Sequence, residues 1–593
     1  MSEKLDALRR LMRKHNIQAY SIPGSDPHQS EYVPEFWRRQ TFITGFTGSA
    51  GDAVVTRDDA GLWTDSRYFL QAGRQLRKSG FSLFRWGLPG VPTWQEWTAR
   101  NLKSGETLGL DPQLISCRDY EKLRRELAAK SIQLKSVAAN LVDAIWAEKP
   151  APPVDPVTVL AERYAGESSR SKLIRLRRRL AAEAADAHVL SQLDAIAWLF
   201  NIRGSDVPFN PVAIAYAIIT RKKALLFVAG EKVSPKVRAI LKRDAICKDY
   251  AEFPAALHSL ASAGQRVWLD EEGVSQWVVS RLAGAKLLFK PNPVILAKAI
   301  KNATEIKGST RAHSRDGAAM VEFLSWLEKA VPKGGVTELS AARKLKEIRK
   351  SQPRFQGLSF ETISSYGSHG AVVHYRVNPE TDAPLKQKGI YLTDSGSQYL
   401  DATTDITRTV CLGRPNAEQR DRFTRVLKGV INLTRSSFPQ GTSGPQLDVL
   451  ARRALWEKGS NYGHGTGHGV GSFLSVHEGP QGIAPARGLG INLEPGMILS
   501  VEPGFYKEGE YGIRLENLVL VVRDPFRSSE AQPFYTFEVL TLCPIDVRLL
   551  NKAILTNDEV HWLNAYHQRV RKELTPLLAK EAAAWLRRAT RPI

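Results

Sequence analysis

YLTDSGSQYLDATTDITRTV, residues 391–410, is the most informative stretch of this chain. Asp394 and Asp405 lie eleven residues apart, each in a short β-type run, and the turn-rich SGSQYLDATT connects the two runs. An antiparallel hairpin brings positions of this kind side by side on one face. We therefore expect two neighbouring carboxylates here.

A second stretch, LSVEPGFYKEGEYGIRLENLVL at residues 499–520, repeats the arrangement. Glu502 and Glu516 lie in apolar runs on either side of a loop. An acid that faces a protein core must be paired or bound to a metal. Two hairpins that each offer two carboxylates therefore predict a basin of four acids.

One histidine completes a potential metal site with these acids. His468 lies in YGHGTGHGVGSF, residues 462–473. Carboxylate oxygens suit Mn or Mg, and an imidazole extends the range to Zn, Co or Fe. Two such ions a few ångströms apart hold a hydroxide between them and clamp a carbonyl under attack. The five ligands Asp394, Asp405, His468, Glu502 and Glu516 therefore predict a hydrolase.

Histidine and glycine are concentrated in the same region. Five of the twelve histidines fall between residues 369 and 477, and the alternating glycines of 463–471 let backbone approach the site closely. The sequence contains no G-x-G-x-x-G register here, no Walker lysine, no H-E-x-x-H and no G-x-S-x-G, which excludes dinucleotide, single-zinc and serine-hydrolase sites of those types. We expect the clustered histidines to serve as ligand, proton donor and substrate contacts: His374, His464, His468 and His477.

Length and composition set the outer bounds. A chain of 593 residues is too long for one hydrophobic core and predicts about three to four domains. No run approaches the roughly 18 apolar residues of a membrane span, so no membrane association is expected. The four cysteines are scattered, which favours a reducing compartment and buried thiols.

The formal net charge of +22 raises the question of nucleic-acid binding. The densest basic cluster, SRSKLIRLRRRL from Ser169, carries Leu173, Leu176 and Leu180 at helical spacing. This pattern predicts an amphipathic helix with a solvated cationic face. Since zinc-finger spacing, an RNP pattern and a basic zipper region are all missing from the sequence, nucleic acid is not an expected partner.

Two N-terminal segments resemble each other: EKLDALRRLMRKHNIQAYSI at residues 3–22 and SKLIRLRRRLAAEAADAHVLSQ at residues 171–192. Each is a basic amphipathic helix followed by an apolar run, and a Gly-Ser pair precedes further strands in both halves. The first helix contains Glu3 and Asp6, which are out of character for a transit peptide, so we assign it to the first domain. The repeat predicts two α/β domains of common design.

A third region opens near residue 302. The proline-rich KPAPPVDP, residues 149–156, predicts a linker between the two N-terminal domains, and at the start of the third region Asn302 with Glu305 has capping-box spacing. A helical apolar stripe then follows, formed by Met320, Phe323, Leu324 and Leu327. We predict an N-terminal α/β domain at 1–150, a second at 151–304 and an α+β catalytic domain at 305–593, with a C-terminal extension at 533–593.

These residues resemble the pita-bread metallopeptidases, which include methionine aminopeptidase, prolidase and aminopeptidase P. The order Asp, Asp, His, Glu, Glu is similar to that family's dinuclear site. The phrases GFTGSAG, WTDSRYFLQA, AWLFNIRGSDVPFNPV, TTDITRTV, GHGTGHGVGSFLSVHEGP and SVEPGFY are similar to the long, cytosolic-type Xaa-Pro aminopeptidase. The resemblance covers essentially the whole chain and implies two creatinase-like domains followed by a pita-bread domain.

The resemblance also implies a role for each site residue. Asp394 would chelate one metal, His468 and Glu502 the other, and Asp405 and Glu516 would bridge both. Glu502 would handle a proton, and His374 and His477 would hydrogen-bond the substrate and stabilise the tetrahedral intermediate. The remaining contacts implied are a wall for the proline ring, a second-layer support for a metal-bound acid, and a peptide contact from the first domain: His464, His477 and Tyr506; Arg514; and Arg67.

The predicted reaction is removal of the N-terminal residue from peptides with proline in second position, by a hydroxide that bridges two divalent metals, Mn first, with Zn or Co as alternatives. Two alternatives stay open: a prolidase, which accepts only Xaa-Pro dipeptides, and a catalytically silent binding module on the same fold. The resemblance further implies a cytoplasmic homodimer, with the C-terminal tail as a contributor to its interface.

Overall fold

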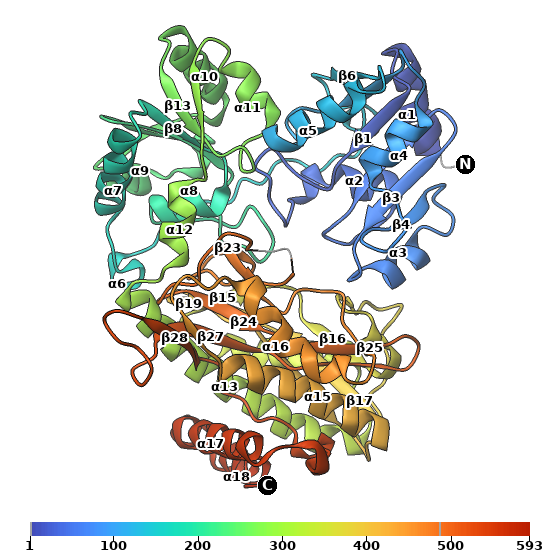
Figure 1. Cartoon of the computed structure of the whole chain (residues 1–593), viewed down its shortest axis with the longest axis vertical. Coiled ribbons are helices and arrows are strands. Elements are labelled where there is room, and N and C mark those ends of the chain that lie inside the picture. The colour runs from blue at the N-terminus through green and yellow to red at the C-terminus, as the bar shows by residue number, and fades with distance from the viewer. Residues whose placement is uncertain (1–2, 486–487) are drawn as a thin grey trace. The chain divides into compact units, whose positions relative to one another are not determined.

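The computed structural model describes residues 3–485 and 488–593. The chain forms two compact units, one of Met1–Leu160 with Glu167–Val294 and one of Ala161–Gly166 with Ile295–Ile593 (Figure 1). The chain therefore enters the second unit, leaves it and enters it again. Within the described ranges, none of the helices has the length and apolar character needed to span a bilayer.

The first unit contains two six-stranded sheets of identical topology. The first has the order β4-β3-β2-β1-β5-β6 and the second β12-β11-β10-β8-β13-β14. In both, the strand after the opening helix pairs antiparallel with one neighbour and parallel with the other. The bounds are β1 Ala19–Ile22, β2 Asp52–Thr56, β3 Ala60–Thr64, β4 Ser82–Arg85, β5 Thr107–Leu110 and β6 Gln133–Ser136, then β8 Ala187–Leu190, β10 Ala215–Thr220, β11 Ala224–Val228, β12 Ile246–Lys248, β13 Arg266–Leu269 and β14 Lys286–Phe289. The predicted relation between the two N-terminal domains is confirmed.

The two predicted basic amphipathic helices open these sheets. Helix α1 (Glu3–Lys14) buries Leu5 and Leu8, and α7 (Ser169–Ala182) buries all three predicted leucines. One detail of α7 differs from the expected solvated cationic face. Lys172 is buried, with its Nζ 4.0 Å from the Trp198 ring centroid and 2.7 Å from Asn201 Oδ1. A cation over an aromatic face with a polar acceptor tolerates burial, which helical spacing alone could not reveal.

The remaining helices of the first unit are short. They are α2 Arg39–Thr44, α3 Phe69–Gln75, α4 Trp94–Asn101, α5 Cys117–Ala128, α8 Leu193–Leu199, α9 Pro235–Leu241, α10 Phe253–Ser262 and α11 Gln276–Arg281. A two-stranded ladder joins β7 (Thr158–Val159) to β9 (Ile202–Arg203). Three of the four cysteines are buried as predicted, whereas Cys247 on the edge strand β12 is half-buried.

The second unit is built around a long helix, α13 (Ala303–Ala330). Asn302 caps it, and Glu305 completes the predicted capping box. All four residues of the predicted apolar stripe are buried in the core of this unit. The other helices are α6 Glu162–Ala165, α12 Pro293–Ala299, which begins two residues before this unit, α14 Glu338–Lys350, α15 Ala417–Thr434 and α16 Gly444–Trp456.

Two main β-sheets build the second unit together with these helices. The larger has the order β21-β28-β27-β24-β22-β23 and the smaller β16-β17-β20, and the unit also contains a three-stranded sheet β15-β18-β19 and the hairpin β25-β26. The strands are β15 Phe355–Leu358, β16 Ile363–Tyr366, β17 Ile390–Ser395, β18 Ser397–Tyr399, β19 Ala402–Thr403, β20 Ile406–Cys411, β21 Ser437–Pro439, β22 Gly467–Gly469, β23 Glu478–Ile483, β24 Ile498–Val501, β25 Gly504–Lys507, β26 Tyr511–Arg514, β27 Asn517–Arg523 and β28 Phe534–Val539. This mixture of helices and antiparallel sheets agrees with the predicted α+β catalytic domain.

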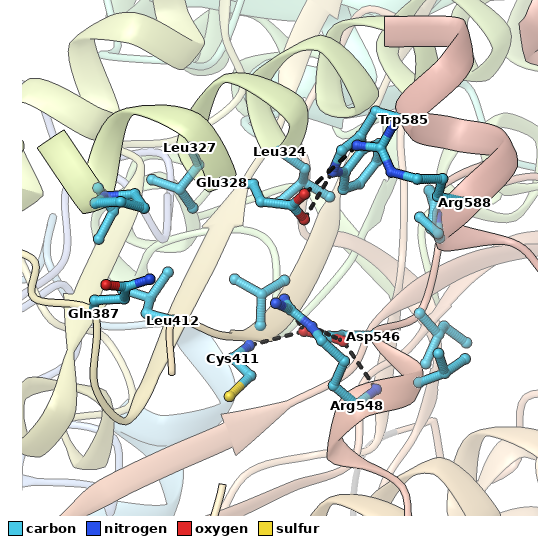
Figure 2. Close-up of a pocket in the computed structure, with 17 residues that line it drawn as sticks. Leu324, Leu327, Glu328, Gln387, Cys411, Leu412, Asp546, Arg548, Trp585 and Arg588 are labelled. Carbon is cyan, nitrogen blue, oxygen red and sulfur yellow. Dashed lines mark hydrogen bonds and ion pairs between the residues drawn. The ribbon is translucent and has the colours of Figure 1, made fainter. Parts of the chain in front are cut away.

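The C-terminal tail belongs to the same core. After β28, the helices α17 (Asn557–Leu574) and α18 (Lys580–Ala589) pack against α13 (Figure 1). Figure 2 shows Trp585 of α18 facing Glu328 of α13, where its Nε1 donates to the carboxylate over 2.9 Å. The cavity of about 300 Å³ between them also meets Cys411 at the far end of β20. The tail therefore covers α13 and is part of the second unit.

Candidate metal centre

The four acids are positioned by one structural device used twice. The outer strands β17 and β20 pair antiparallel, and the hairpin β18–β19 is inserted between them in sequence. In the same way β24 pairs with β27, and the hairpin β25–β26 lies between them. Each predicted hairpin therefore differs from a simple one, because the connection between its two strands contains a second pair of strands.

The strand register brings the acids of each pair together. The last pairs of the two ladders are Ser395 with Ile406 and Val501 with Asn517. Asp405 immediately precedes β20, while Glu502 and Glu516 flank the end of the β24–β27 ladder. Because side chains alternate along a strand, Asp394 and Asp405 share one face, as do Glu502 and Glu516.

Glycines let the histidine strand reach this site. His468 is the central residue of β22, next to β24 in the larger sheet. A Cβ atom on Gly467 would lie 2.0 Å from the Ser500 carbonyl oxygen, and one on Gly469 would lie 2.3 Å from that of Glu478. Only glycine fits at both positions, which agrees with the close backbone approach predicted from the alternating glycines.

The ligand atoms converge. One atom each of Asp405, His468 and Glu516 lie within 4.8 Å of one another, and all three residues are buried. His468 Nε2 lies 3.6 Å from Asp405 Oδ2 and 3.6 Å from Glu502 Oε1. Asp394 is tied to the group through Arg514, whose Nη2 donates to Asp394 Oδ2 over 2.7 Å. The structure thus gathers all five predicted ligands in one region.

Three carboxylate oxygens of this basin accept no hydrogen bond from the described residues. Asp394 Oδ1, Asp405 Oδ1 and Glu516 Oε1 are buried and have no hydrogen-bond partner among the described residues. Burial and then repulsion from Glu516 raise the pKa of Asp405 well above its usual range, and burial likewise raises the pKa of Glu516. Burial also raises the pKa of Glu502 to about 7. Buried carboxylates with orphaned oxygens and one imidazole fit divalent cations.

The hydrogen bond of the His468 ring fixes which nitrogen faces the acids. Its Nδ1 lies 2.9 Å from the Gly469 carbonyl oxygen, which can only accept. The Nδ1 atom therefore carries the hydrogen, and Nε2 presents its lone pair to the basin. A backbone carbonyl of this kind commonly orients a metal-binding histidine.

A polar network supports the acids from one side. Arg514, 1% exposed, donates from Nη1 to the Tyr506 hydroxyl over 2.8 Å. The Tyr506 hydroxyl also lies 2.8 Å from His464 Nε2, which accepts from it in the neutral tautomer that donates Nδ1–H to the Gly465 carbonyl. The predicted proline-wall residues His464 and Tyr506 are therefore held in contact with the predicted support Arg514.

Thr407 is a site residue that the sequence analysis missed. Its hydroxyl donates to Glu516 Oε2 over 2.8 Å and accepts from Arg514 Nε over 3.2 Å. Thr407 lies opposite Asp394 in the β17–β20 register. The available signal was its position two residues after Asp405 on a strand, which places both side chains on one face.

His477 and His374 approach the basin from two loops. The His477 and His468 ring centroids are 4.4 Å apart, edge to face. The preceding neighbour of His374, Val373, accepts from Arg514 Nη2 over 3.3 Å. Both histidines are partly exposed, as groups that meet a substrate must be.

The residue after His477 belongs to a second buried cluster, which was also missed. The Glu478 carboxylate lies 2.6 Å from the Nζ atoms of both Lys298 and Lys301, and all three side chains are at most 1% exposed. The cluster joins the end of α12 and the start of α13 to the His477 loop. The two lysines and Glu478 are far apart in sequence, so a local sequence motif could not predict their contact.

Arg67 lies in the first unit. It binds Asp65 through two hydrogen bonds, Nε to Oδ1 over 2.9 Å and Nη2 to Oδ2 over 2.7 Å. Its Nη1 lies 3.8 Å from Glu31 Oε1. Its predicted contact with a peptide substrate remains a prediction.

Comparison with known families gives four matches along the chain. Residues 307–523 match metallopeptidase family M24, and 533–593 match the C-terminal region of peptidase M24. Residues 4–144 and 148–305 each match a creatinase/prolidase N-terminal domain. These matches agree with a twofold N-terminal repeat followed by a catalytic unit.

Similar proteins cover the full length. The probable Xaa-Pro aminopeptidase P of Coprinopsis cinerea is 43% identical, over 100% of this chain and 98% of its own, and that of Sordaria macrospora is 42% identical over 100% and 99%. The crystal structure of an X-prolyl aminopeptidase from Caenorhabditis elegans, described as a cytosolic enzyme with a di-nuclear active site, superposes with a TM-score of 0.96 at 38% identity, over 100% and 99% of the two chains. A Bacillus anthracis Xaa-Pro dipeptidase, 23% identical with a TM-score of 0.51 over 64% of this chain and 99% of its own, shares the fold.

Proposed function

The chain belongs to metallopeptidase family M24, among the Xaa-Pro aminopeptidases, and from this we propose that it removes the N-terminal residue from peptides whose second residue is proline. The observation that carries the proposal is the basin of buried acids, three of which present oxygens without a hydrogen-bond partner among the described residues. A basin of this kind is costly to a protein unless cations occupy it.

We propose two divalent ions as the resident cofactor, Mn first, with Zn and Co as alternatives. Asp394 would hold one ion, His468 and Glu502 the other, and Asp405 and Glu516 would hold both. When bound, the ions would polarise the scissile carbonyl and supply the hydroxide that attacks it. Arg514 and Thr407 would keep Asp394 and Glu516 in orientation through the hydrogen bonds described above.

The protein's own side chains would manage protons and charge. Glu502, at the edge of the basin with its side chain 19% exposed, is placed to take and return a proton at its carboxylate oxygen. His477 and His374 would donate hydrogen bonds to the oxygen that gains charge during attack. Binding would be strongest when that charge develops, which is the condition for catalysis.

Proline specificity has a chemical and a structural component. The Xaa-Pro bond is a tertiary amide without an N–H, so an enzyme that holds substrate by that donor cannot use it. The Tyr506 ring, fixed by Arg514 and His464, would offer the pyrrolidine ring an apolar wall. We expect cleavage of Xaa-Pro-Xaa tripeptides and no comparable cleavage of Xaa-Ala-Xaa. Equal turnover of the two would contradict the specificity but leave the family assignment intact.

A prolidase activity is the alternative within the family. We favour longer substrates because the long N-terminal region includes Arg67, proposed to contact peptide beyond the proline. An assay that compares an Xaa-Pro dipeptide with a proline-containing pentapeptide separates the two activities. A clear preference for the dipeptide would favour prolidase.

A silent binding module is the alternative from another class. Such a module should neither bind two ions nor gain activity from them. Elemental analysis before and after chelation, followed by reconstitution with Mn and a peptidase assay, distinguishes this module from the enzyme. Stoichiometric metal with restored turnover is the expected result.

We also propose a cytoplasmic homodimer. The cytosolic relative from Caenorhabditis elegans and the scattered, unpaired cysteines support the compartment. The C-terminal tail is proposed to contribute to the subunit interface. Light scattering that gave about one chain mass, 65.9 kDa, across micromolar concentrations would contradict the dimer.

A further inference from the structure

A second pocket of the catalytic unit carries an excess of positive charge. It has a volume of about 500 Å³, and none of the metal-centre residues lines it. Its lining includes four cationic side chains, Arg163, Lys307, Arg311 and Arg354, and one acid, Asp401, which gives a formal balance of four minus one, or +3. A volume of this size suits a small ligand.

Two of the pocket cations, Lys307 and Arg311, lie on one face of α13. Lys307, Arg311 and Arg315 are spaced four residues apart on α13 and so share a face. At Gly308, between the first two, a Cβ atom would lie 2.3 Å from the Asp401 backbone oxygen. The helix therefore packs directly on the turn between β18 and β19, which delivers Asp401 to the cationic face.

The charge of Asp401 is already balanced. Its side chain is 4% exposed, and its two oxygens accept from Arg315 Nη2 and Arg354 Nη1, each over 2.5 Å. Within residues 3–485 and 488–593, no ion pair joins Arg163, Lys307 or Arg311 to any acid. These three cations therefore face the pocket without a compensating charge from the described protein.

The Tyr164 ring lies beside the guanidinium groups of the other two pocket cations, Arg163 and Arg354. The guanidinium carbons of Arg163 and Arg354 lie 5.1 and 5.3 Å from the centroid of the Tyr164 ring. The ring holds both guanidinium planes near the pocket, which limits their side-chain freedom before any ligand binds. Arg163 and Tyr164 belong to α6, so the short excursion of the chain into this unit contributes two of the eight described residues that line the pocket.

We propose that this pocket binds a small anion that bears a phosphate group and at least two negative charges. Guanidinium groups match phosphate oxygens through paired hydrogen bonds, and a lysine adds a point charge. Neighbouring like charges on α13 destabilise the helix when no anion is present. A bound phosphate would remove that repulsion and connect α6 to α13.

Pyrophosphate and inorganic phosphate are suitable probes, titrated into the metal-loaded full-length protein by calorimetry at low and at physiological salt. The test variant is Lys307→Gln with Arg311→Gln. Its matched control is Lys346→Gln with Lys350→Gln, which removes the same charge at the same spacing from exposed positions of α14. We expect saturable pyrophosphate binding by the wild type and the control, and a Kd at least about tenfold weaker in the test variant, with the larger difference at low salt.

Three results would contradict the proposed anion site. Equal pyrophosphate affinity in all three proteins would show that the anion binds elsewhere, for example at the metal centre. Absence of saturable binding by the wild type would reject the site outright, as would binding of a single-stranded oligonucleotide without binding of pyrophosphate. Unchanged peptidase turnover without added anion verifies folding, and if the double variant does not fold, Arg163→Gln provides the same test from the exposed end of α6.

Discussion

The metal basin and the Glu478 cluster are two groups of buried charge in one unit, and they differ in what balances them. The ammonium groups of Lys298 and Lys301 each lie 2.6 Å from the Glu478 carboxylate, so one acid forms ion pairs with two cations of the chain. In the basin, four acids meet one fully charged partner, Arg514, and three of their oxygens have no donor among the described residues. The first cluster is balanced by the protein's own lysines, whereas the second fits the divalent cations proposed above.

The difference shows how a structural acid can be separated from a functional one. Burial is the same in both places, so burial alone does not identify a metal ligand. What separates the two is the positive charge that faces the buried oxygens, since a buried carboxylate oxygen with neither a donor nor a cation of the protein beside it is retained only where a ligand satisfies it. By this criterion Asp394, Asp405 and Glu516 are candidate ligands, whereas each oxygen of Glu478 lies 2.6 Å from a lysine ammonium group.

The strongest test removes a bridging acid. We expect Asp405→Asn or Glu516→Gln to lose metal and turnover together, by more than about a thousandfold in kcat/KM, because several kcal/mol of charge stabilisation disappear. Elemental analysis and a tripeptide assay on the same sample measure both losses. Full metal content in either variant would contradict the bridging assignment.

The second test contrasts the two clusters through stability. Glu478→Gln leaves two buried lysines without their acid and should lower the free energy of unfolding by about 3–5 kcal/mol. Glu516→Gln should leave the chelated protein equally stable or more stable, because it removes repulsion among acids. Denaturant unfolding of both chelated variants measures this. Equal destabilisation by the two substitutions would show that the acids of both clusters are balanced by the protein itself.

The third test concerns the two histidines that we propose to contact the substrate. His477→Ala and His374→Ala should keep both metals and lower kcat by about 10²–10³-fold, the usual loss for one donor to a developing charge. His477→Ala also serves the comparison, because it leaves the adjacent Glu478 cluster in place. An unchanged kcat would refute the assignment.

The smallest effect is in pH dependence. In the metal-free protein the raised pKa values mean that the folded state holds protons that the unfolded chain has released, so the unfolding free energy falls as pH rises. For Glu502 this window runs from the ordinary 4.5 to about 7. Thermal unfolding of chelated protein should therefore show a lower Tm at pH 7.5 than at pH 5.5. Added metal should raise the Tm more at the higher pH, since metal and protons compete for the same oxygens, and a Tm gain independent of pH would contradict this.

Sequence reasoning found the five candidate ligands that the structure brings together, because each of the four acids interrupts an apolar run and the histidine lies in a glycine-rich segment, and both are local signals. It also predicted the repeated N-terminal fold and the capping of α13, because a similar pattern of residues occurs twice and the capping residues are three positions apart. It missed the hairpins inserted at β18–β19 and β25–β26, because strand pairing there depends on neighbouring sheets. The contact of Lys301 with Glu478 spans 177 residues, and only packing in three dimensions determines it.

The excursion of residues 161–166 limits how this protein can be divided. The Asn302 side chain caps α13 and donates to the Ala165 carbonyl over 2.8 Å, and a Cβ atom on Gly166 would lie 2.2 Å from Asn302 Oδ1. A fragment that starts at Ile295 would lack α6 and leave this corner of the helix open. Proteolysis or recombinant truncation at one point cannot release the catalytic unit intact, and a peptide of residues 161–166 would have to be supplied in trans.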